Sequence, residues 1–262
     1  MKYLILAIVS AVFSVFFVYK YLLDRRFPEE ITVKRVIDGD TIELKSGRLV
    51  RYIGIDAPET RQKGKDGWVF DPQPFALEAK SLNQRLVEGK KIRLEYDVRK
   101  EDVHNRLLAY VYVGNTFVNE EMVKQGYAIV YMYPPNVRYI DLLVRAEKEA
   151  KNNNRGFWSS VRSHPISIAE ARNYIGEVRV VEGRVLTVYG GGKVMNLNFG
   201  SSRERSFHVT IFRNMLDRFE TQGIYPVSYK GKKVKVTGMI GSYRGCPRII
   251  VCDPSQIEVI AR

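Results

Sequence analysis

The chain has 262 residues, enough for one large domain or two small ones, and 45% of them are hydrophobic, as in a globular protein. The excess of Lys and Arg (42, against 29 Asp and Glu) gives a net charge of +13, which favours a polyanionic partner over mere solubility. The two cysteines, Cys246 and Cys252, lie in one expected strand about 20 Å apart, which excludes a disulfide between them and argues against a zinc site.

The N-terminal segment is the strongest indication of cellular location. Residues 3–19 are apolar apart from two serines, and the apolar stretch continues to residue 23, close to the ~20 residues that span a bilayer. We therefore expect residues 1–26 to form a transmembrane anchor or a signal segment, with residues 3–23 in the membrane; a buried core helix is the alternative. Bulky aromatic residues where a cleavage site would have small ones favour the anchor. Basic residues on both flanks leave its orientation open.

From residue 31 the hydrophobic pattern has a period of two. It predicts three strands joined by tight turns: Ile31–Asp38, Thr41–Lys45 and Leu49–Asp56. A loop over 61–74 and a helix over 75–88 are expected next, then strands at 91–98 and 107–113, helices at 118–126 and 139–152, and Trp158 as a core anchor. Five strands with a helix between the third and fourth are typical of a small OB-type barrel.

The second half begins after an aperiodic boundary at 159–166. A short helix is expected at 168–174, followed by strands at 178–188, 195–199, 207–212, 232–240, 248–251 and 257–260. The predicted fold is therefore α+β and mainly β, with two small five-stranded OB-type barrels, the first carrying three helices. The predicted domains are 27–160 and 161–262, after the N-terminal segment 1–26.

Two short runs hold a concentration of carboxylates. They are Ile37–Thr41, which contains Asp-Gly-Asp, and Arg51–Thr60, which contains Asp-Ala-Pro-Glu. Each run alone has a structural explanation, as a tight hairpin turn or as a strand end before a proline. Together, carboxylates with no neighbouring His or Cys suit a hard, oxygen-preferring cation, and an arginine suits a phosphate or another carboxylate.

Residues 31–160 resemble the staphylococcal (micrococcal) nuclease family. The pairing of Val36–Thr41 with Arg51–Thr60, in that order, is highly specific. Further matching segments follow in order: Asn105–Tyr110, Val118–Asn119, Gly126–Ala128, Tyr131–Tyr133, Ala146–Ala150 and Gly156–Ser159.

The resemblance implies a calcium site. Asp40 and Asp56 match the two carboxylates that bind Ca²⁺ in the family. Ala57 stands where the family often has threonine, and it is expected to contribute its backbone carbonyl, which alanine retains. Asp38 matches an acid just behind the metal.

The resemblance also implies the residues that act on the substrate. Glu59 matches the glutamate proposed to activate the attacking water, and Arg51 and Arg106 match the two arginines on the scissile phosphate. Tyr131 and Tyr133 match tyrosines near the nucleotide, although their alternation allows one of them to be core.

Two departures touch the substrate contacts. Val103 and His104 stand where the best-known member has a lysine and a tyrosine that contact the substrate, so His104 is either a substrate contact or a solvated turn residue. The 61–74 loop also differs and contains Trp68.

The second half resembles an OB-fold module of bacterial proteins. The match rests on short segments: Ile175–Glu177, Val181–Gly183, Leu197–Gly200, Phe207–Ile211, Tyr229–Lys232, Val236–Gly238, Tyr243–Gly245 and Asp253–Ile257. Such barrels often bind single-stranded nucleic acid, here through Lys230, Lys232, Lys233, Lys235, Tyr243 and Arg244. A purely structural barrel is the alternative.

The family resemblance implies a calcium-dependent endonuclease for DNA and RNA, in which water attacks phosphorus and 3′-phosphate ends remain. The alternatives are a non-catalytic, membrane-tethered nucleic-acid-binding protein and a membrane adaptor that binds anionic lipid. Because calcium is abundant outside cells, we expect an extracytoplasmic catalytic domain, membrane-anchored or, if residues 1–26 are cleaved, secreted. No protein partner is predicted.

Overall fold

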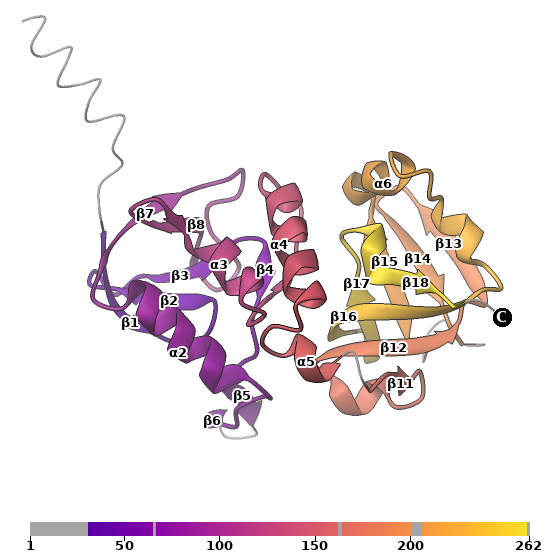
Figure 1. The fold of residues 1–262 in the computed structure, drawn as a ribbon, viewed down its shortest axis with the longest axis horizontal. Coiled ribbons are helices and arrows are strands. Elements are labelled where there is room, and N and C mark those ends of the chain that lie inside the picture. Colours follow the sequence, from indigo (N-terminus) through magenta and orange to yellow (C-terminus); the bar gives the residue numbers. More distant parts are fainter. Residues whose placement is uncertain (1–30, 65–66, 162–163, 201–205, 261–262) are drawn as a thin grey trace, which may run out of the picture.

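The structure is a computed structural model, and it describes residues 31–64, 67–161, 164–200 and 206–260. Two units lie side by side, one formed by residues 31–161 and the other by residues 164–260 (Figure 1). The predicted anchor or signal at 1–26 lies outside the described residues and stays a prediction. Within the described ranges, no helix combines the length and the apolar character needed to cross a membrane.

The first unit is built on a closed barrel of five strands. Alternate side chains of the strands point inward, so Val33, Ile42 and Val50 are completely buried. The ring closes because the third and the last strand pair in parallel, through Val50–Leu107 and its neighbours. The strands are β1 (Ile31–Val36), β2 (Thr41–Leu44), β3 (Leu49–Tyr52), β7 (Lys91–Glu95) and β8 (Leu107–Val113), with β9 (Thr116–Phe117) added to β8. The α+β, mainly β fold predicted from the sequence is confirmed.

The predicted third strand is wrong beyond Tyr52. The chain turns at Gly54, whose φ of 83° favours glycine, and a Cβ there would lie only 2.7 Å from Leu143 Cδ1. The strand that follows, β4 (Ile55–Asp56), leaves the barrel and pairs with β10 (Ile129–Val130). This break places Asp56 beside the first turn of the barrel instead of along its wall.

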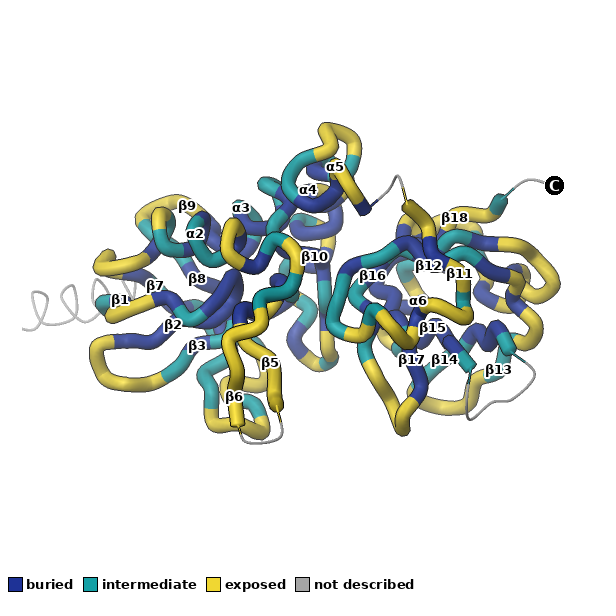
Figure 2. The backbone as a smooth tube through the Cα atoms, turned by 90° about the horizontal axis from the view of Figure 1, so that it is seen from below, coloured by how far each residue is buried: buried dark blue, intermediate teal, exposed yellow. Residues whose placement is uncertain are grey.

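The expected 61–74 loop contains a hairpin. Its strands β5 (Arg61–Gly64) and β6 (Gly67–Phe70) pair with each other, and the described residues of both are exposed (Figure 2).

Helices cover one side of the barrel. α2 packs on β1 and α3, and α3 packs on β8 and α4. Trp158, at the start of α5, is completely buried, which confirms the predicted core anchor. The helices are α2 (Ala76–Val87), α3 (Val118–Lys124), α4 (Ile140–Asn152) and α5 (Trp158–Val161), so the three predicted helices are confirmed to within two residues at each end.

The second unit contains one sheet in the order β11-β12-β16-β17-β15-β14-β13, with β18 also on β16. Its strands are β11 (Ile166–Ser167), β12 (Val178–Arg184), β13 (Thr187–Gly191), β14 (Val194–Asn198), β15 (His208–Phe212), β16 (Lys233–Tyr243), β17 (Cys246–Ile250) and β18 (Ile257–Val259). The strand predicted over 178–188 is thus divided in two. The likeness of the second unit to an OB barrel stays a prediction.

Short helices complete the second unit. The 3₁₀ helices η1 (Ala171–Tyr174), η2 (Pro226–Tyr229) and η3 (Pro254–Gln256) connect strands, and η1 lies within the helix predicted over 168–174. The helix α6 (Arg213–Glu220) was not predicted. Both cysteines are buried thiols without a disulfide, as expected.

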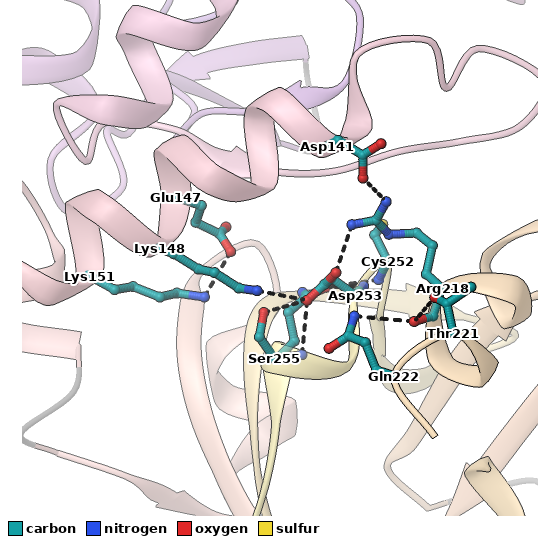
Figure 3. A network of polar contacts seen from close by, with 11 residues as sticks. Asp141, Glu147, Lys148, Lys151, Arg218, Thr221, Gln222, Cys252, Asp253 and Ser255 are labelled. Atoms are coloured by element: carbon teal, nitrogen blue, oxygen red, sulfur yellow. Dashed lines mark hydrogen bonds and ion pairs between the residues drawn. The ribbon is translucent and has the colours of Figure 1, made fainter. Parts of the chain in front are cut away.

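The two units share buried contacts. One hydrophobic cluster includes Met132 of the first unit and Cys252 of the second, and the Met132 backbone N–H donates to Cys252 Sγ at 3.4 Å. Beside it, Asp253 is 2% exposed and accepts from Arg218 at 2.8 Å, while Arg218 also pairs with Asp141 on α4 (Figure 3). Of these contacts, Met132–Cys252 and Arg218–Asp141 cross between the units and join them, whereas Arg218–Asp253 lies within the second unit.

Candidate active site

The turn between β1 and β2 holds the first two carboxylates. It is closed by the Ile37 N–H donating to the Thr41 carbonyl at 2.9 Å, and the Asp40 N–H donates to Asp38 Oδ1 at 3.0 Å. A Cβ at Gly39 would lie 2.5 Å from the Ala57 Cβ, so glycine is needed for the turn to approach the 57–59 segment. The turn-forming residues thereby bring Asp40 next to Ala57.

Arg51 joins the carboxylates of the two motifs. From β3, its guanidinium lies 2.5 Å from Asp40 Oδ2 and 2.5 Å from Asp56 Oδ1. The Ala57 N–H donates to the same Asp40 oxygen at 2.7 Å. The side chain of Asp40 is 2% exposed and that of Arg51 is 14% exposed. Both ion pairs are therefore largely shielded from water.

The cluster carries more negative charge than Arg51 neutralises. Burial, followed by repulsion from Asp40, raises the pKa of Asp38 well above its usual range. Burial also raises the pKa of Asp56 to about 6, although attraction to Arg51 acts against it. Burial alone would lower the pKa of Arg51, but attraction to Asp40 and Asp56 outweighs it and raises that pKa. Arg51 thus stays charged while two neighbouring acids hold protons more tightly than usual.

Glu59 lies at the rim of the cluster. Two hydrogen bonds to Gln73 hold its backbone. The Glu59 N–H donates to the side-chain oxygen of Gln73 at 2.8 Å, and the backbone N–H of Gln73 donates to the Glu59 carbonyl at 3.0 Å. Loss of hydration among the surrounding groups, followed by repulsion from Asp40, raises the pKa of Glu59 to about 7. A carboxylate with a pKa near 7 is suited to accept a proton at neutral pH.

Arg106 reaches the cluster from the start of β8. Its Nε donates to Asp102 at 2.7 Å, and its charge acts to lower the pKa of both Asp56 and Glu59. His104 occupies the exposed turn between Asp102 and Arg106, where its backbone N–H donates to Asp102 at 2.8 Å. That position agrees with the solvated-turn alternative, and a substrate contact by His104 stays a prediction.

A cleft of about 260 Å³ lies next to the cluster. Arg51, Arg106, Tyr131 and Tyr133 all contribute to its lining. Tyr131 is partly buried, and its pKa is raised to about 12 by burial and then by the charge of Asp56. Tyr133 is 54% exposed. Tyr131 therefore packs against the hydrophobic core while it lines the cleft, and a contact of either tyrosine with the nucleotide stays a prediction.

Several residues that support this arrangement were missed from the sequence. The side chain of Asn83, completely buried on α2, donates to the Asp38 carbonyl at 3.0 Å and accepts from the Tyr52 hydroxyl at 2.9 Å. Arg99, which follows β7, also lines the cleft. A polar residue on the apolar face of a helix was the available signal for Asn83; Arg99 stands among several charged residues and had no such signal.

The donors present fit a hard cation. Among the residues that the structure describes, no three His, Cys, Asp or Glu side chains are grouped to hold a metal ion. The predicted set of Asp40, Asp56 and the Ala57 carbonyl needs only two carboxylates, and all its donors are oxygens, as calcium prefers. Water and substrate oxygens would complete the six to eight ligands that calcium usually takes. Burial is the main cause of the raised pKa values of Asp38 and Asp56, and a divalent cation next to these acids would favour their ionised forms.

Comparison with known proteins identifies the first unit. The profile of the family described as staphylococcal nuclease homologue matches residues 49–160. The thermonuclease of Staphylococcus hyicus is 38% identical over 131 residues, which are 49% of this chain and 75% of that protein. Endonuclease YncB of Bacillus subtilis (strain 168) is 40% identical over 134 residues, 49% of this chain and 61% of that protein. The SPbeta prophage-derived endonuclease YokF of the same strain is 39% identical over 135 residues, but the match covers only 44% of that protein.

The raised acid pKa values predict how stability depends on pH without metal. Where a folded-state pKa is raised, the unfolded chain loses its proton first, so stability falls as pH rises from the ordinary pKa to the folded one. For Asp56 and Glu59 that window runs from about pH 4 to about pH 7. Asp38→Asn removes one repelling charge and keeps the acceptor for the Asp40 N–H. In chelator, we expect it to raise the thermal unfolding midpoint by a few degrees at pH 7.5 and by less at pH 5.

Asp71→Asn, which changes an exposed carboxylate in the 61–74 segment, is the matched control, and its midpoint should change equally at the two pH values. Thermal unfolding followed by circular dichroism measures both. A midpoint gain by Asp38→Asn that is the same at pH 5 and pH 7.5 would contradict the charge-repulsion account.

Proposed function

This chain belongs to the staphylococcal nuclease family, and from that premise we propose that it is a calcium-dependent endonuclease for DNA and RNA. The observation that carries the proposal is the convergence of Asp40, Arg51 and Asp56 beside a cleft that Arg106 also lines. The similar proteins compared above are named as endonucleases or thermonucleases. The matched segments are about half of this chain, so the activity of the whole protein is a proposal.

Each residue has a role that its position supports. Asp40, Asp56 and the Ala57 carbonyl would hold the calcium ion, which when bound supplies positive charge next to the phosphate. Arg51 and Arg106 bind the phosphate oxygens and stabilise the extra negative charge of the five-coordinate transition state, because a planar guanidinium can bond two oxygens at once.

Proton transfer falls to Glu59. With a pKa of about 7, Glu59 takes a proton from the attacking water or orients it toward phosphorus. The 5′-oxygen then leaves and a 3′-phosphate end remains. Tyr131 and Tyr133 bind the nucleotide next to the scissile bond. The Asp38 carboxyl group accepts the Asp40 backbone N–H and so positions Asp40.

The alternative function is nucleic-acid binding without turnover, by a membrane-tethered protein. Such a protein needs the barrel and the basic surface but not the acids of the cluster. Here Glu59 is present with a pKa near neutrality, and Arg51 lies between two largely buried carboxylates, at a desolvation cost that binding alone does not require. These features favour the enzyme.

The substitution Glu59→Gln separates the two functions. The amide retains the shape of the side chain but cannot take a proton, so the calcium-dependent cleavage rate of a labelled single-stranded DNA should fall on the order of 10²–10³-fold. Glu78→Gln, on the exposed face of α2, removes the same charge away from the cluster and should leave the rate unchanged.

Chelator should abolish cleavage by the unsubstituted protein. Absence of calcium-dependent cleavage by the unsubstituted protein would remove the enzyme proposal and leave the binding alternative. Cleavage by Glu59→Gln at the unsubstituted rate would remove Glu59 from its role.

We also propose that the catalytic unit works outside the cytoplasm, anchored through residues 3–23 or released after cleavage of residues 1–26. The proposal is supported by the apolar N-terminal sequence and by the need for calcium. Cell fractionation with protease added to intact spheroplasts tests it. Protease-sensitive protein in the membrane fraction, or a shortened protein in the medium, is expected. Full-length, protease-protected protein in the soluble fraction would contradict the proposal.

A further inference from the structure

A second groove, of about 720 Å³, lies on the sheet of the second unit. We call it the sheet groove; the residues that matter here are Tyr133, Tyr189, His208, Tyr243, Arg244 and Arg248, all of which line it. Its floor is formed by polar side chains of β14 and β15, among which His208 and Thr210 are buried. Alternate residues of these strands point the other way, and Leu197, Val209 and Ile211 are completely buried there. The groove is thus a polar face supported by a rigid core.

Two arginines lie beside one tyrosine ring in the wall of the sheet groove. The guanidinium carbon of Arg248 lies 4.7 Å from the centroid of the Tyr243 ring, and that of Arg244 lies 5.4 Å from it. Tyr243 is nevertheless 47% exposed. The described residues that line this groove include no Asp or Glu. Guanidinium groups beside an exposed aromatic ring provide the contacts by which proteins hold the phosphates and bases of a single strand.

The sheet groove continues from the active-site cleft. Tyr133 lines both, and its ring packs edge-on against Phe212 of the second unit with the centroids 5.1 Å apart. Tyr131, two residues earlier, lines the cleft with Arg51, and the charges of Asp56 and Arg248 both act on its pKa. Between them, Met132 is completely buried, and its backbone N–H donates a hydrogen bond to Cys252 Sγ. The 131–133 segment therefore connects the catalytic cluster to the groove.

The basic residues singled out in the sequence do not all belong to this surface. Lys230, Lys232 and Lys233 lie at the start of β16, whereas Tyr243 ends it. A strand rises about 3.3 Å per residue, so the two ends of this 11-residue strand are roughly 30 Å apart. The sequence run of lysines and the Tyr243–Arg244 pair are thus separate features, and only the second lines the groove.

We propose that the sheet groove binds the portion of a single-stranded nucleic acid that extends beyond the scissile phosphate, so that one strand is held across both units. The proposal rests on the proposed nuclease function for its substrate. Bases stack on Tyr243 and Tyr133, and phosphates pair with Arg244 and Arg248. A single strand is the occupant because stacking requires unpaired bases, whereas a duplex presents only its phosphates and groove edges.

The test compares two double substitutions in the full-length chain. Arg244→Ala with Arg248→Ala removes two positive charges from the sheet groove. Lys230→Ala with Lys232→Ala removes two exposed positive charges at the far end of β16. Binding of a fluorescent 20-nucleotide oligothymidine is measured by anisotropy in chelator, over a range of salt concentrations, so that cleavage does not interfere.

We expect the arginine double variant to bind at least tenfold more weakly, with the slope of log K against log salt reduced by about 1.4, or ~0.7 for each lost phosphate contact. The lysine double variant should bind like the unsubstituted protein. Equal effects of the two double variants, or no effect of the arginine pair, would overturn the proposal.

Cleavage distinguishes failure of this proposal from failure of the proposed function. With calcium, the ratio of kcat/KM for the 20-mer to kcat/KM for a trinucleotide should fall at least tenfold in the arginine double variant and stay constant in the lysine one. Cleavage with an unchanged ratio overturns only the proposal that the sheet groove binds the strand. Absence of cleavage with the expected binding difference overturns the nuclease function alone.

Two substitutions at one position cover the case in which the arginine double variant does not fold. Tyr243→Ala removes the stacking surface, whereas Tyr243→Phe keeps it. Weaker 20-mer binding by Tyr243→Ala than by Tyr243→Phe supports stacking in the sheet groove, and equal binding by the two contradicts it.

Discussion

The ion pairs of Arg51 with Asp40 and Asp56 are the interaction on which the candidate site depends. Without the guanidinium, these carboxylates would face each other in a poorly hydrated pocket, a costly arrangement. Three elements of the first unit bring these side chains together: Asp40 lies in the turn between β1 and β2, Arg51 on β3, and Asp56 on β4, which leaves the barrel to pair with β10. Burial, together with repulsion from Asp40, keeps the pKa values of Asp56 and Glu59 raised even though Arg51 and Arg106 act to lower them.

This electrostatic imbalance has to be reconciled with a polyanionic substrate. A cluster of acids repels phosphates, whereas the chain as a whole carries a net charge of +13. Basic groups lie near the acids: Arg106 and Arg99 line the cleft, and Arg248 lines the sheet groove, which shares Tyr133 with the cleft. The contacts of Cys252 with Met132 and of Arg218 with Asp141 join the second unit, and with it Arg248, to the unit that holds the cluster.

The sequence predicted what is encoded locally. Alternating apolar residues located β1, β2 and β8, and the two carboxylate-rich motifs contain Asp40, Arg51 and Asp56, which the structure brings together. The break after Tyr52 was missed because the apolar alternation continues through Ile53 and Ile55 and so hides the turn at Gly54, where φ is 83°. The sheet groove could not be foreseen, because it is formed by strands that pair across long stretches of chain. Helix α6 was detectable, since Met215, Leu216 and Phe219 share one helical face.

Calcium binding by the cluster is the central claim, and isothermal titration of the full-length chain with calcium chloride measures it directly. The account predicts one bound ion per chain, with binding lost in Asp40→Asn and retained in the control Asp71→Asn. Titration without detectable binding, or binding that Asp40→Asn leaves unchanged, would contradict it.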